Sequence, residues 1–226
     1  MIQNLEEYEE IIFEIIQEYL NKKRVFYMEK LIPYLNKKIS KSKFNIANSG
    51  IQKILLSLVK KNMIVEGTTL TKKEVLMNSR RKEIYDYINK NPGKYVTKIS
   101  KKLKINSNVV FWHLKILIKF NFIKKIIIDN HIVYFNSNIN LRDAKKIYLI
   151  SKEKSKKIIN YLESNNFGFT RTKLARVLNI HRDTIKNYLK SLEEFNIIYK
   201  IKRSNQILYL LKENSIYGGC KKKVYI

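Results

Sequence analysis

Apolar residues recur along the chain at the three- and four-residue spacings of helices that bury one side. In the middle of the sequence, residues 84–88 carry such a stripe, and Pro92-Gly93 behind it is typical of a helix end followed by a turn. A second, shorter stripe contains Ile99 and Leu103. The pattern predicts two helices separated by a tight connection.

The residues that follow supply caps and a third helix. Residues 95–96 are long enough only for a short strand, and Thr97 is suited to capping the second helix. Residues 106–108, Asn-Ser-Asn, predict a turn and a further cap. The third helix presents apolar residues at spacings of four and three, namely Val110, Leu114 and Leu117.

Beyond this helix the apolar pattern changes to a strand-like one. Residues 123–128 and 131–135 are rich in isoleucine, valine and aromatic residues, and Asp129-Asn130 between them is suited to a turn. The order helix, short strand, helix, turn, helix, hairpin is that of a helix-turn-helix with a wing.

This pattern occurs twice in clear form. Residues 97–135 and 172–210 align without a gap at an offset of 75, and 15 of the 39 positions are identical. Most of the identities are apolar, so both segments are expected to fold around the same kind of core. A weaker third copy lies at residues 51–64, at an offset of 59 from the middle segment.

The fold class expected from these copies is α+β, mostly helical, with three tandem winged helix-turn-helix modules, each of three helices and a small β-hairpin wing. The modules are predicted at residues 1–75, 78–138 and 150–212, followed by a basic, flexible tail at residues 213–226. Polar linkers are expected near residues 70–78 and 137–152, the second with a connecting helix from Leu141 to Ile150.

The first module is the most divergent. Its wing is short, around Glu66-Gly67-Thr68, and it begins with a long amphipathic helix. The inner side of that helix is predicted to contain Leu5, Tyr8, Ile12, Ile15, Ile16 and Tyr19.

The chain carries a formal charge of +27, from 46 Lys and Arg against 19 Asp and Glu. An AT-rich genome alone would raise Lys, Ile and Asn, but such a charge still gives a surface potential of several kT and indicates a polyanionic partner. Residues 1–18 hold six Glu and no Lys or Arg, so the remainder carries 27 + 6 = +33. We interpret the acidic helix as a solvated face; the alternative is a docking surface for a basic partner or a basic module of this chain.

Several function classes are disfavoured. The sequence has no apolar run of about 18 residues and no signal-peptide pattern, so we expect no membrane partner and a cytoplasmic, nucleoid-associated protein. Cys220 is the only cysteine and the three histidines are scattered, so neither a metal site nor a cofactor is expected. No phosphate loop, nucleophile motif or carboxylate pair stands out, and we therefore do not expect an enzyme.

The middle segment contains a Trp-His-Leu-x-x-Leu run from Trp112 to Leu117, together with Asn91-Pro92-Gly93, Ile99, Leu103, Ile105, Val110-Phe111 and Phe122-Ile123. These residues resemble those of archaeal winged helix-turn-helix transcriptional regulators related to the ArsR- and MarR-like families. The resemblance covers residues 79–136 directly, 153–211 through the repeat, and 5–70 loosely. It implies DNA binding by the third helix, with the wing beside it.

In a helix-turn-helix the third helix lies in the major groove, and its first residues reach base edges. In the last copy Arg182 is suited to guanine and Asn187 to adenine, while Asp183 is either a base contact or a helix cap. The cations suited to phosphates are Lys186 and Lys190 on the helix, with Lys200, Lys202 and Arg203 on the wing.

The third helix of the middle copy differs. At equivalent positions it holds Ser107, Asn108 and Lys115 as candidate DNA contacts, but Phe111 and Trp112 replace Lys186 and Asn187. The two aromatic residues could pack against another module, contact thymine methyl groups, or form a protein-binding surface. We favour packing or partner contact, and Phe111, Trp112 and His113 form a candidate interface. For His113 we expect a core or dimer-interface position rather than metal ligation.

Two functions follow. The favoured one is sequence-specific or semi-specific binding of double-stranded DNA, as a transcriptional regulator that works without a cofactor. The alternative is a tandem winged-helix scaffold for protein interactions, as in subunits of the transcription machinery or of sorting complexes. Transcription machinery and self-association are additional candidate partners. RNA binding is less favoured, because no aromatic-rich sheet for base stacking is evident.

Overall fold

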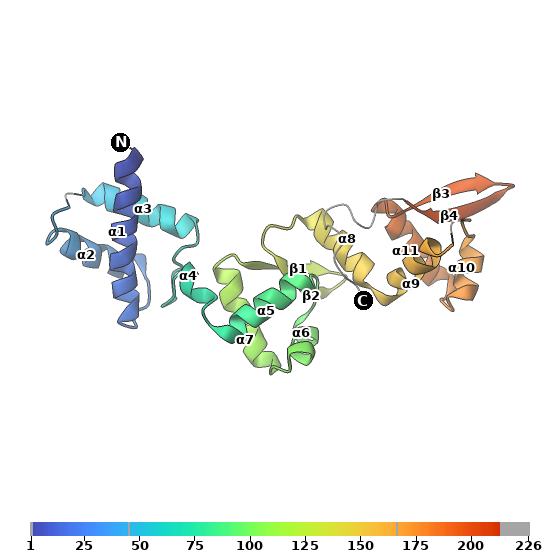
Figure 1. The fold of residues 1–226 in the computed structure, drawn as a ribbon, viewed down its shortest axis with the longest axis horizontal. Coiled ribbons are helices and arrows are strands. Elements are labelled where there is room, and N and C mark those ends of the chain that lie inside the picture. Colours follow the sequence, from blue (N-terminus) through green and yellow to red (C-terminus); the bar gives the residue numbers. More distant parts are fainter. Residues whose placement is uncertain (1, 45, 166, 213–226) are drawn as a thin grey trace. The chain divides into compact units, whose positions relative to one another are not determined.

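The computed structural model describes residues 2–44, 46–165 and 167–212. The chain divides between Asn138 and Ile139 into two compact units, which are described separately below. Over the described residues the structure contains eleven helices and two antiparallel hairpins (Figure 1). The expected mostly helical α+β fold is thus confirmed. The predicted tail, with Cys220, lies outside the described residues.

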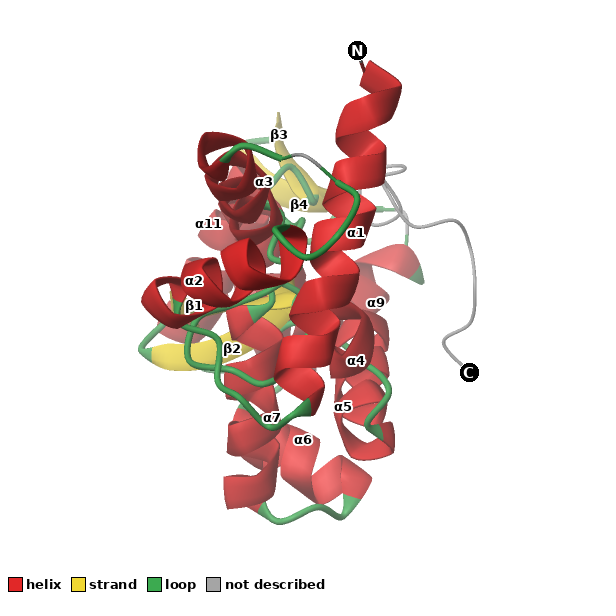
Figure 2. Cartoon of the chain, turned by 90° about the vertical axis from the view of Figure 1, so that its left-hand side faces the viewer, coloured by secondary structure: helices red, strands yellow, loops and turns green. Residues whose placement is uncertain are grey.

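The N-terminal unit begins with three helices around one core (Figure 2). They are α1 (Ile2–Asn21), α2 (Met28–Ile39) and α3 (Asn48–Lys60). Helix α1 buries Ile12 and Ile16, four residues apart, completely against this core. Tyr8 and Ile15 are partly buried there, and Tyr19 is 4% exposed. The predicted inner side of the helix is therefore confirmed where its side chains are described.

The short wing of this part is a single antiparallel bridge between Ile64 and Thr71. The connection from α1 to α2 lies beside it, because the Phe26 N–H donates to the Thr68 carbonyl and the Phe26 carbonyl accepts from the Gly67 N–H, both at 2.9 Å. The Phe26 side chain is fully buried. Backbone hydrogen bonds and one buried ring thus hold this connection in place.

Residues 70–78 do not form the polar linker that the sequence suggests. They contain a single helical turn, α4 (Lys72–Val75), and both Thr71 and Val75 are fully buried. The Glu74 carboxylate accepts hydrogen bonds of 2.7 Å from the N–H and the hydroxyl of Thr71. A few buried apolar side chains, and polar side chains that hydrogen-bond within the segment, are enough to give this stretch a defined structure.

The rest of the N-terminal unit follows the predicted order of elements except for the short strand expected at residues 95–96. In its place there is an isolated bridge at Lys94, and Val96 already begins the next helix. The elements are α5 (Ser79–Lys90), α6 (Val96–Leu103), α7 (Ser107–Lys119), β1 (Ile123–Ile128) and β2 (His131–Asn136). The prediction of Thr97 as a cap was wrong, since Tyr95 is the N-cap of α6. The reason is an antiparallel bridge between Lys94 and Tyr134, which keeps the chain extended as far as Tyr95.

Short polar residues set the turns as expected. The Asn106 side chain caps α7 by accepting a 2.8 Å hydrogen bond from the Asn108 N–H. Asp129 and Asn130 both have positive φ, at 48° and 62°. Two consecutive left-handed residues are what a two-residue hairpin turn requires.

The C-terminal unit repeats these elements after an additional helix. It contains α8 (Leu141–Ser151), α9 (Glu153–Glu163), α10 (Arg171–Val177), α11 (Arg182–Glu194), β3 (Ile198–Arg203) and β4 (Gln206–Leu211). Helix α8 corresponds to the predicted connecting helix. The bounds of α11, β3 and β4 lie 75 residues after those of α7, β1 and β2, and a bridge between Phe169 and Tyr209 repeats that between Lys94 and Tyr134.

Three clusters of buried side chains form the cores, over residues 12–64 and 75–134 in the first unit and 149–198 in the second. In the two later clusters the third helix supplies a fully or almost fully buried stripe, made of Val110, Leu114 and Leu117 and of Ile185, Leu189 and Leu192. The organisation into three winged-helix modules, with the boundaries given above, stays a prediction.

Gly168 has a φ of +73°, and a Cβ at this position would lie 3.0 Å from Leu210 Cδ1. We expect Gly168→Ala to destabilise the C-terminal unit by about 2 kcal/mol, because it combines backbone strain with overpacking. Gly67→Ala is the matched control, since φ is +72° but the nearest atom, Lys119 Nζ, is 3.7 Å away. Urea unfolding monitored by hydrogen exchange in each unit measures both losses. Equal losses would show that the contact with Leu210 is unimportant.

Candidate nucleic-acid interface

Helix α11 has two chemically different sides. Ile185 and Leu192 are fully buried and Leu189 is 1% exposed, so this side belongs to the core. The other side is exposed and contains Arg182, Asp183, Lys186, Asn187 and Lys190. The structure therefore brings the predicted helix residues together on one accessible surface, which we call the α11 face. It offers one guanidinium, two ammonium groups, one carboxamide and one carboxylate.

The N-terminus of α11 is capped by His181, not by Asp183. The His181 Nδ1 accepts a 3.3 Å hydrogen bond from the Asp183 N–H. The Asp183 side chain is 82% exposed, with its carboxylate 3.6 Å from His181 Nδ1. It lies in the first helical turn, where a negative charge is favoured by the helix dipole.

The cations of the wing lie in two different environments. Lys200 forms a 3.0 Å ion pair with Glu193 near the end of α11, and hydrogen bonding to this carboxylate raises the pKa of Lys200. Lys202 and Arg203 are exposed, and Arg203 pairs with Gln206 across the last register position before the turn. Lys200 thus joins the wing to α11, whereas Lys202 and Arg203 extend toward the tip of the hairpin.

The corresponding side of α7 is also exposed, but its chemistry is different. Ser107, Asn108 and Lys115 are accessible, and Phe111 and Trp112 are 46% and 54% exposed. The Ser107 hydroxyl donates to that of Ser100 at 3.1 Å. This side has few groups able to read base edges, in contrast to the α11 face.

Beneath Trp112 lies a pair of buried nitrogen-bearing side chains, of which sequence reasoning missed one. His113 is 5% exposed and in edge contact with the Trp112 ring, with 4.9 Å between ring centroids. Arg81 is 3% exposed, and its Nη1 donates to the Val75 carbonyl at 2.7 Å. Among the described residues, Arg81 Nε and His113 Nδ1 have no hydrogen-bond partner. The Arg-Arg-Lys-Glu run containing Arg81 resembles a solvated helix face, so the sequence offers no signal of this burial.

The acidic first helix is partly neutralised by lysines of its own unit. Glu9 pairs with Lys61 at 2.6 Å, and Glu18 pairs with Lys22 and Lys38, both at 2.8 Å. Hydrogen bonds from Lys22 and Lys38 lower the pKa of Glu18 to about 2. These contacts favour the interpretation of a solvated, internally paired face.

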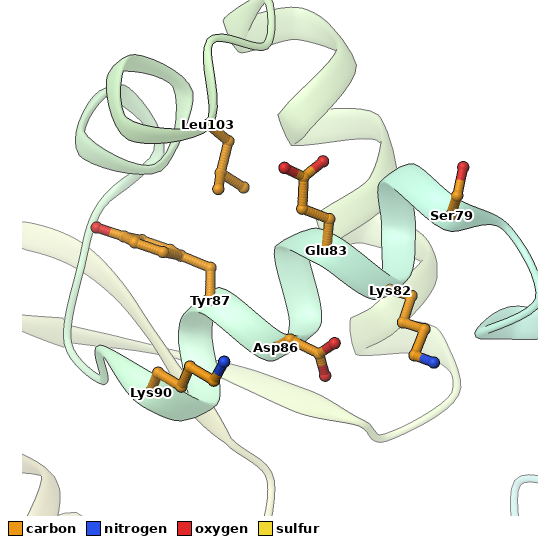
Figure 3. A pocket seen from close by; sticks show the side chains of 7 residues that line it. All are labelled: Ser79, Lys82, Glu83, Asp86, Tyr87, Lys90 and Leu103. Atoms are coloured by element: carbon orange, nitrogen blue, oxygen red, sulfur yellow. The ribbon is translucent and has the colours of Figure 1, made fainter.

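Two hollows lie on the surface of the described residues. One of about 470 Å³ lies along α5, where Glu83 and Tyr87 point to the side of Leu103 (Figure 3). Another of about 490 Å³ lies between α1 and α2 and is lined by tyrosines and cations such as Tyr27 and Lys30. The described part of the chain contains no group of three His, Cys, Asp or Glu side chains placed to hold a metal ion. Nor is any helix in that part long and apolar enough to cross a membrane.

Comparison with known proteins bears most directly on the C-terminal unit. Residues 154–204 match a family model described as an HTH domain. This segment contains nearly all of α9, with α10, α11 and the first strand of the wing. The C-terminal unit thus contains a helix-turn-helix domain.

A longer similarity connects the chain with a protein of Methanocaldococcus jannaschii named as an uncharacterized HTH-type transcriptional regulator. The two are 33% identical over 159 residues, which is 70% of this chain and 40% of that protein. The chain therefore corresponds to less than half of the length of this relative. The crystal structure of the DIP2311 protein from Corynebacterium diphtheriae aligns with 82% of this chain and 39% of its own, at 12% identity and a TM-score of 0.25. A likeness of that size carries no argument about fold or function.

Burial of His113, and then the nearby Arg81 guanidinium, lower the pKa of His113 below its ordinary value. When the pH falls below about 6.5, the unfolded chain binds a proton at this imidazole that the folded chain does not bind. The free energy of unfolding of the N-terminal unit is therefore expected to decrease as the pH falls through this value, and less so in His113→Phe. Urea unfolding at about pH 7.5 and pH 5.5 measures the difference. The exposed His131 provides the control, His131→Phe, and an unchanged pH dependence in His113→Phe would contradict the assignment.

Proposed function

We propose that this chain is a DNA-binding transcriptional regulator whose C-terminal unit reads double-stranded DNA with α11 and the β3–β4 wing. The observation that carries the proposal is the α11 face, on which Arg182, Lys186 and Asn187 are exposed together in a helix-turn-helix domain. A helix-turn-helix places this helix in the major groove, where such side chains meet base edges.

Each group on the α11 face has a role that fits its chemistry. Arg182, at the start of the helix, can donate two parallel hydrogen bonds to guanine O6 and N7. Asn187 can donate to and accept from adenine in the same groove. Lys186 and Lys190 supply point charges for phosphates, which fix the position of the helix without reading sequence.

The wing supports the same arrangement from beside the helix. The ion pair between Lys200 and Glu193 fixes β3 against the end of α11, so the hairpin and the helix present one combined surface. Lys202 and Arg203 are exposed near the turn, and in this proposal they contact phosphates or the minor groove. Lys200 is then a positioning residue, with its charge already shared with Glu193.

The overall charge of +27 makes affinity for a polyanion strong and sensitive to salt. This term is independent of sequence, so specificity has to come from the α11 face. The name of the Methanocaldococcus relative supports regulation of transcription as the purpose of such binding, and the mostly helical winged arrangement supports a regulator of this type.

The triple variant Arg182→Ala/Lys186→Ala/Asn187→Ala tests this assignment. We expect affinity for a DNA site selected from random duplexes to fall by roughly 100-fold or more, with loss of sequence preference, because one or two base contacts and a phosphate contact are removed. Fluorescence anisotropy at several salt concentrations, with selected and scrambled duplexes, measures both quantities.

A matched control comes from the exposed side of α9. Lys154→Ala/Lys156→Ala/Asn160→Ala removes two positive charges and one carboxamide. The test variant removes the same number of each, one of its two charges being that of an Arg. This control should retain sequence preference and lose only a modest, uniform part of the affinity. If both variants bind the selected site equally well, α11 is not the reading helix.

A substitution at Asp183 is expected to raise the affinity for DNA, whereas the triple variant lowers it. Its carboxylate is 82% exposed beside Arg182, so Asp183→Asn removes a negative charge from the surface proposed to face DNA. Duplex affinity is expected to rise by roughly 3-fold at low salt, while helix stability falls by about 0.5 kcal/mol through loss of the dipole interaction. Anisotropy and thermal unfolding measure the two effects. A decrease in affinity would instead identify Asp183 as a base contact.

A further inference from the structure

Helix α7 exposes two large aromatic rings that its own core does not require. The core side of this helix is formed by Val110, Leu114 and Leu117, which are fully buried. Phe111 and Trp112 are turned away from that stripe and remain 46% and 54% exposed. Two adjacent half-exposed aromatic residues indicate a surface used for binding.

Cations lie over both of these rings. Lys115 Nζ is 4.6 Å from the centroid of Phe111, and Arg81 Cζ is 5.6 Å from that of Trp112. The surrounding sequence, residues 87–128, contains ten Lys and no Asp or Glu. The ligand of this surface is therefore expected to combine negative charge with flat π faces.

This combination argues for a nucleic acid and against a protein partner. The buried parts of protein interfaces are enriched in aromatic residues but depleted of Lys. Two copies of this chain would also repel each other here, because each would bring the same excess of lysines over acidic residues to the contact. Stacking of bases on aromatic side chains within a positively charged surface is instead the usual way in which single strands are bound.

The contacts that aromatic rings can make with bases indicate whether this surface binds paired or unpaired DNA. Phe and Trp rings cannot read base edges by paired hydrogen bonds as Arg and Asn do. They can use their faces on a base, but in a duplex the faces are covered by the neighbouring base pairs. An aromatic ring therefore gains its stacking contact only when bases are unpaired or unstacked.

We propose that α7 binds an unpaired DNA strand, with bases stacked on Phe111 and Trp112 and phosphates neutralised by Lys115 and the neighbouring lysines. Lys119, one helical turn beyond Lys115, extends the positive charge along α7. The buried Arg81 supports the Trp112 ring from below and adds positive charge close to it. The surface is separate from the α11 face and does not depend on duplex reading by α11.

Trp112 is the only tryptophan of the chain, so its fluorescence reports on this surface alone. The full chain is titrated with an oligothymidylate of about 12 nucleotides, and with the same strand paired to oligodeoxyadenylate. We expect saturable quenching by the single strand at concentrations where the duplex has little effect. Phe111→Ala, which keeps the reporter, should weaken single-strand binding by roughly 10-fold or more.

Conservative and control variants separate stacking from general effects. Measured by anisotropy of a labelled strand, Trp112→Phe should bind nearly as the parent chain does, whereas Trp112→Ala should bind roughly 10-fold more weakly. Phe167→Ala removes an 83% exposed aromatic residue of the C-terminal unit and should have no effect. The triple variant of the α11 face should keep the quenching of Trp112, so a failure of duplex reading and a failure of this surface are distinguishable.

Several results would overturn the proposal. Absence of quenching by oligothymidylate, or equal binding by Phe111→Ala in a variant whose circular dichroism and melting are unchanged, excludes stacking at α7. Equal quenching by the duplex removes the preference for unpaired bases. Tighter binding of oligouridylate assigns the surface to RNA. A concentration-dependent shift of Trp112 emission in the chain alone, abolished in Phe111→Ala, assigns it to self-association.

Discussion

One-sided burial of the helix before each hairpin, α7 and α11, is the constraint on which the other features of these two segments depend. In α11 the buried stripe of Ile185, Leu189 and Leu192 fixes the rotation of the helix about its own axis. Rotation by a single residue, about 100°, would replace a fully buried isoleucine by a charged side chain and is prevented by the cost of burying that charge. The identity of the exposed residues is therefore settled by the core, although none of them contributes to it.

A second constraint holds the hairpin against the chain in front of the second helix. A single backbone bridge joins the residue before the N-cap of the second helix to the returning strand of the hairpin, as Lys94 to Tyr134 and as Phe169 to Tyr209. In both copies a glycine of positive φ precedes the bridge, Gly93 at 80° and Gly168 at 73°. The glycine allows the chain to turn sharply enough that the bridge forms, and so determines where the cations of the hairpin lie relative to the helix.

The sequence predicts well the parts of this fold that follow from repeated patterns of residues. It predicts poorly the features that depend on a single contact. The stripes on α1, α7 and α11 and the turn at Asp129-Asn130 follow from patterns of several residues, so one exception does not erase the signal. Other features depend on a single partner or on a single helical turn, which no repeated pattern reveals. These are the cap at Tyr95, the ordered structure of residues 70–78 and the burial of Arg81. The ion pair of Lys200 with Glu193 is of the same kind, since a charge pattern does not show which lysine finds a carboxylate. Exposure on α11 could be predicted from the core stripe, whereas the chemistry of the surface around Trp112 needed the positions of Arg81 and Lys115.

Because the core fixes only the inner side of the third helix, the outer side is free to change its ligand while the fold stays the same. Positions 186 and 187 hold Lys and Asn, which suit phosphates and base edges, and positions 111 and 112 hold Phe and Trp, which suit base faces. Edges are accessible in intact duplex and faces only where it has opened. On the two proposals made above, one chain would therefore carry one helix for paired DNA and one for DNA that has lost its pairing.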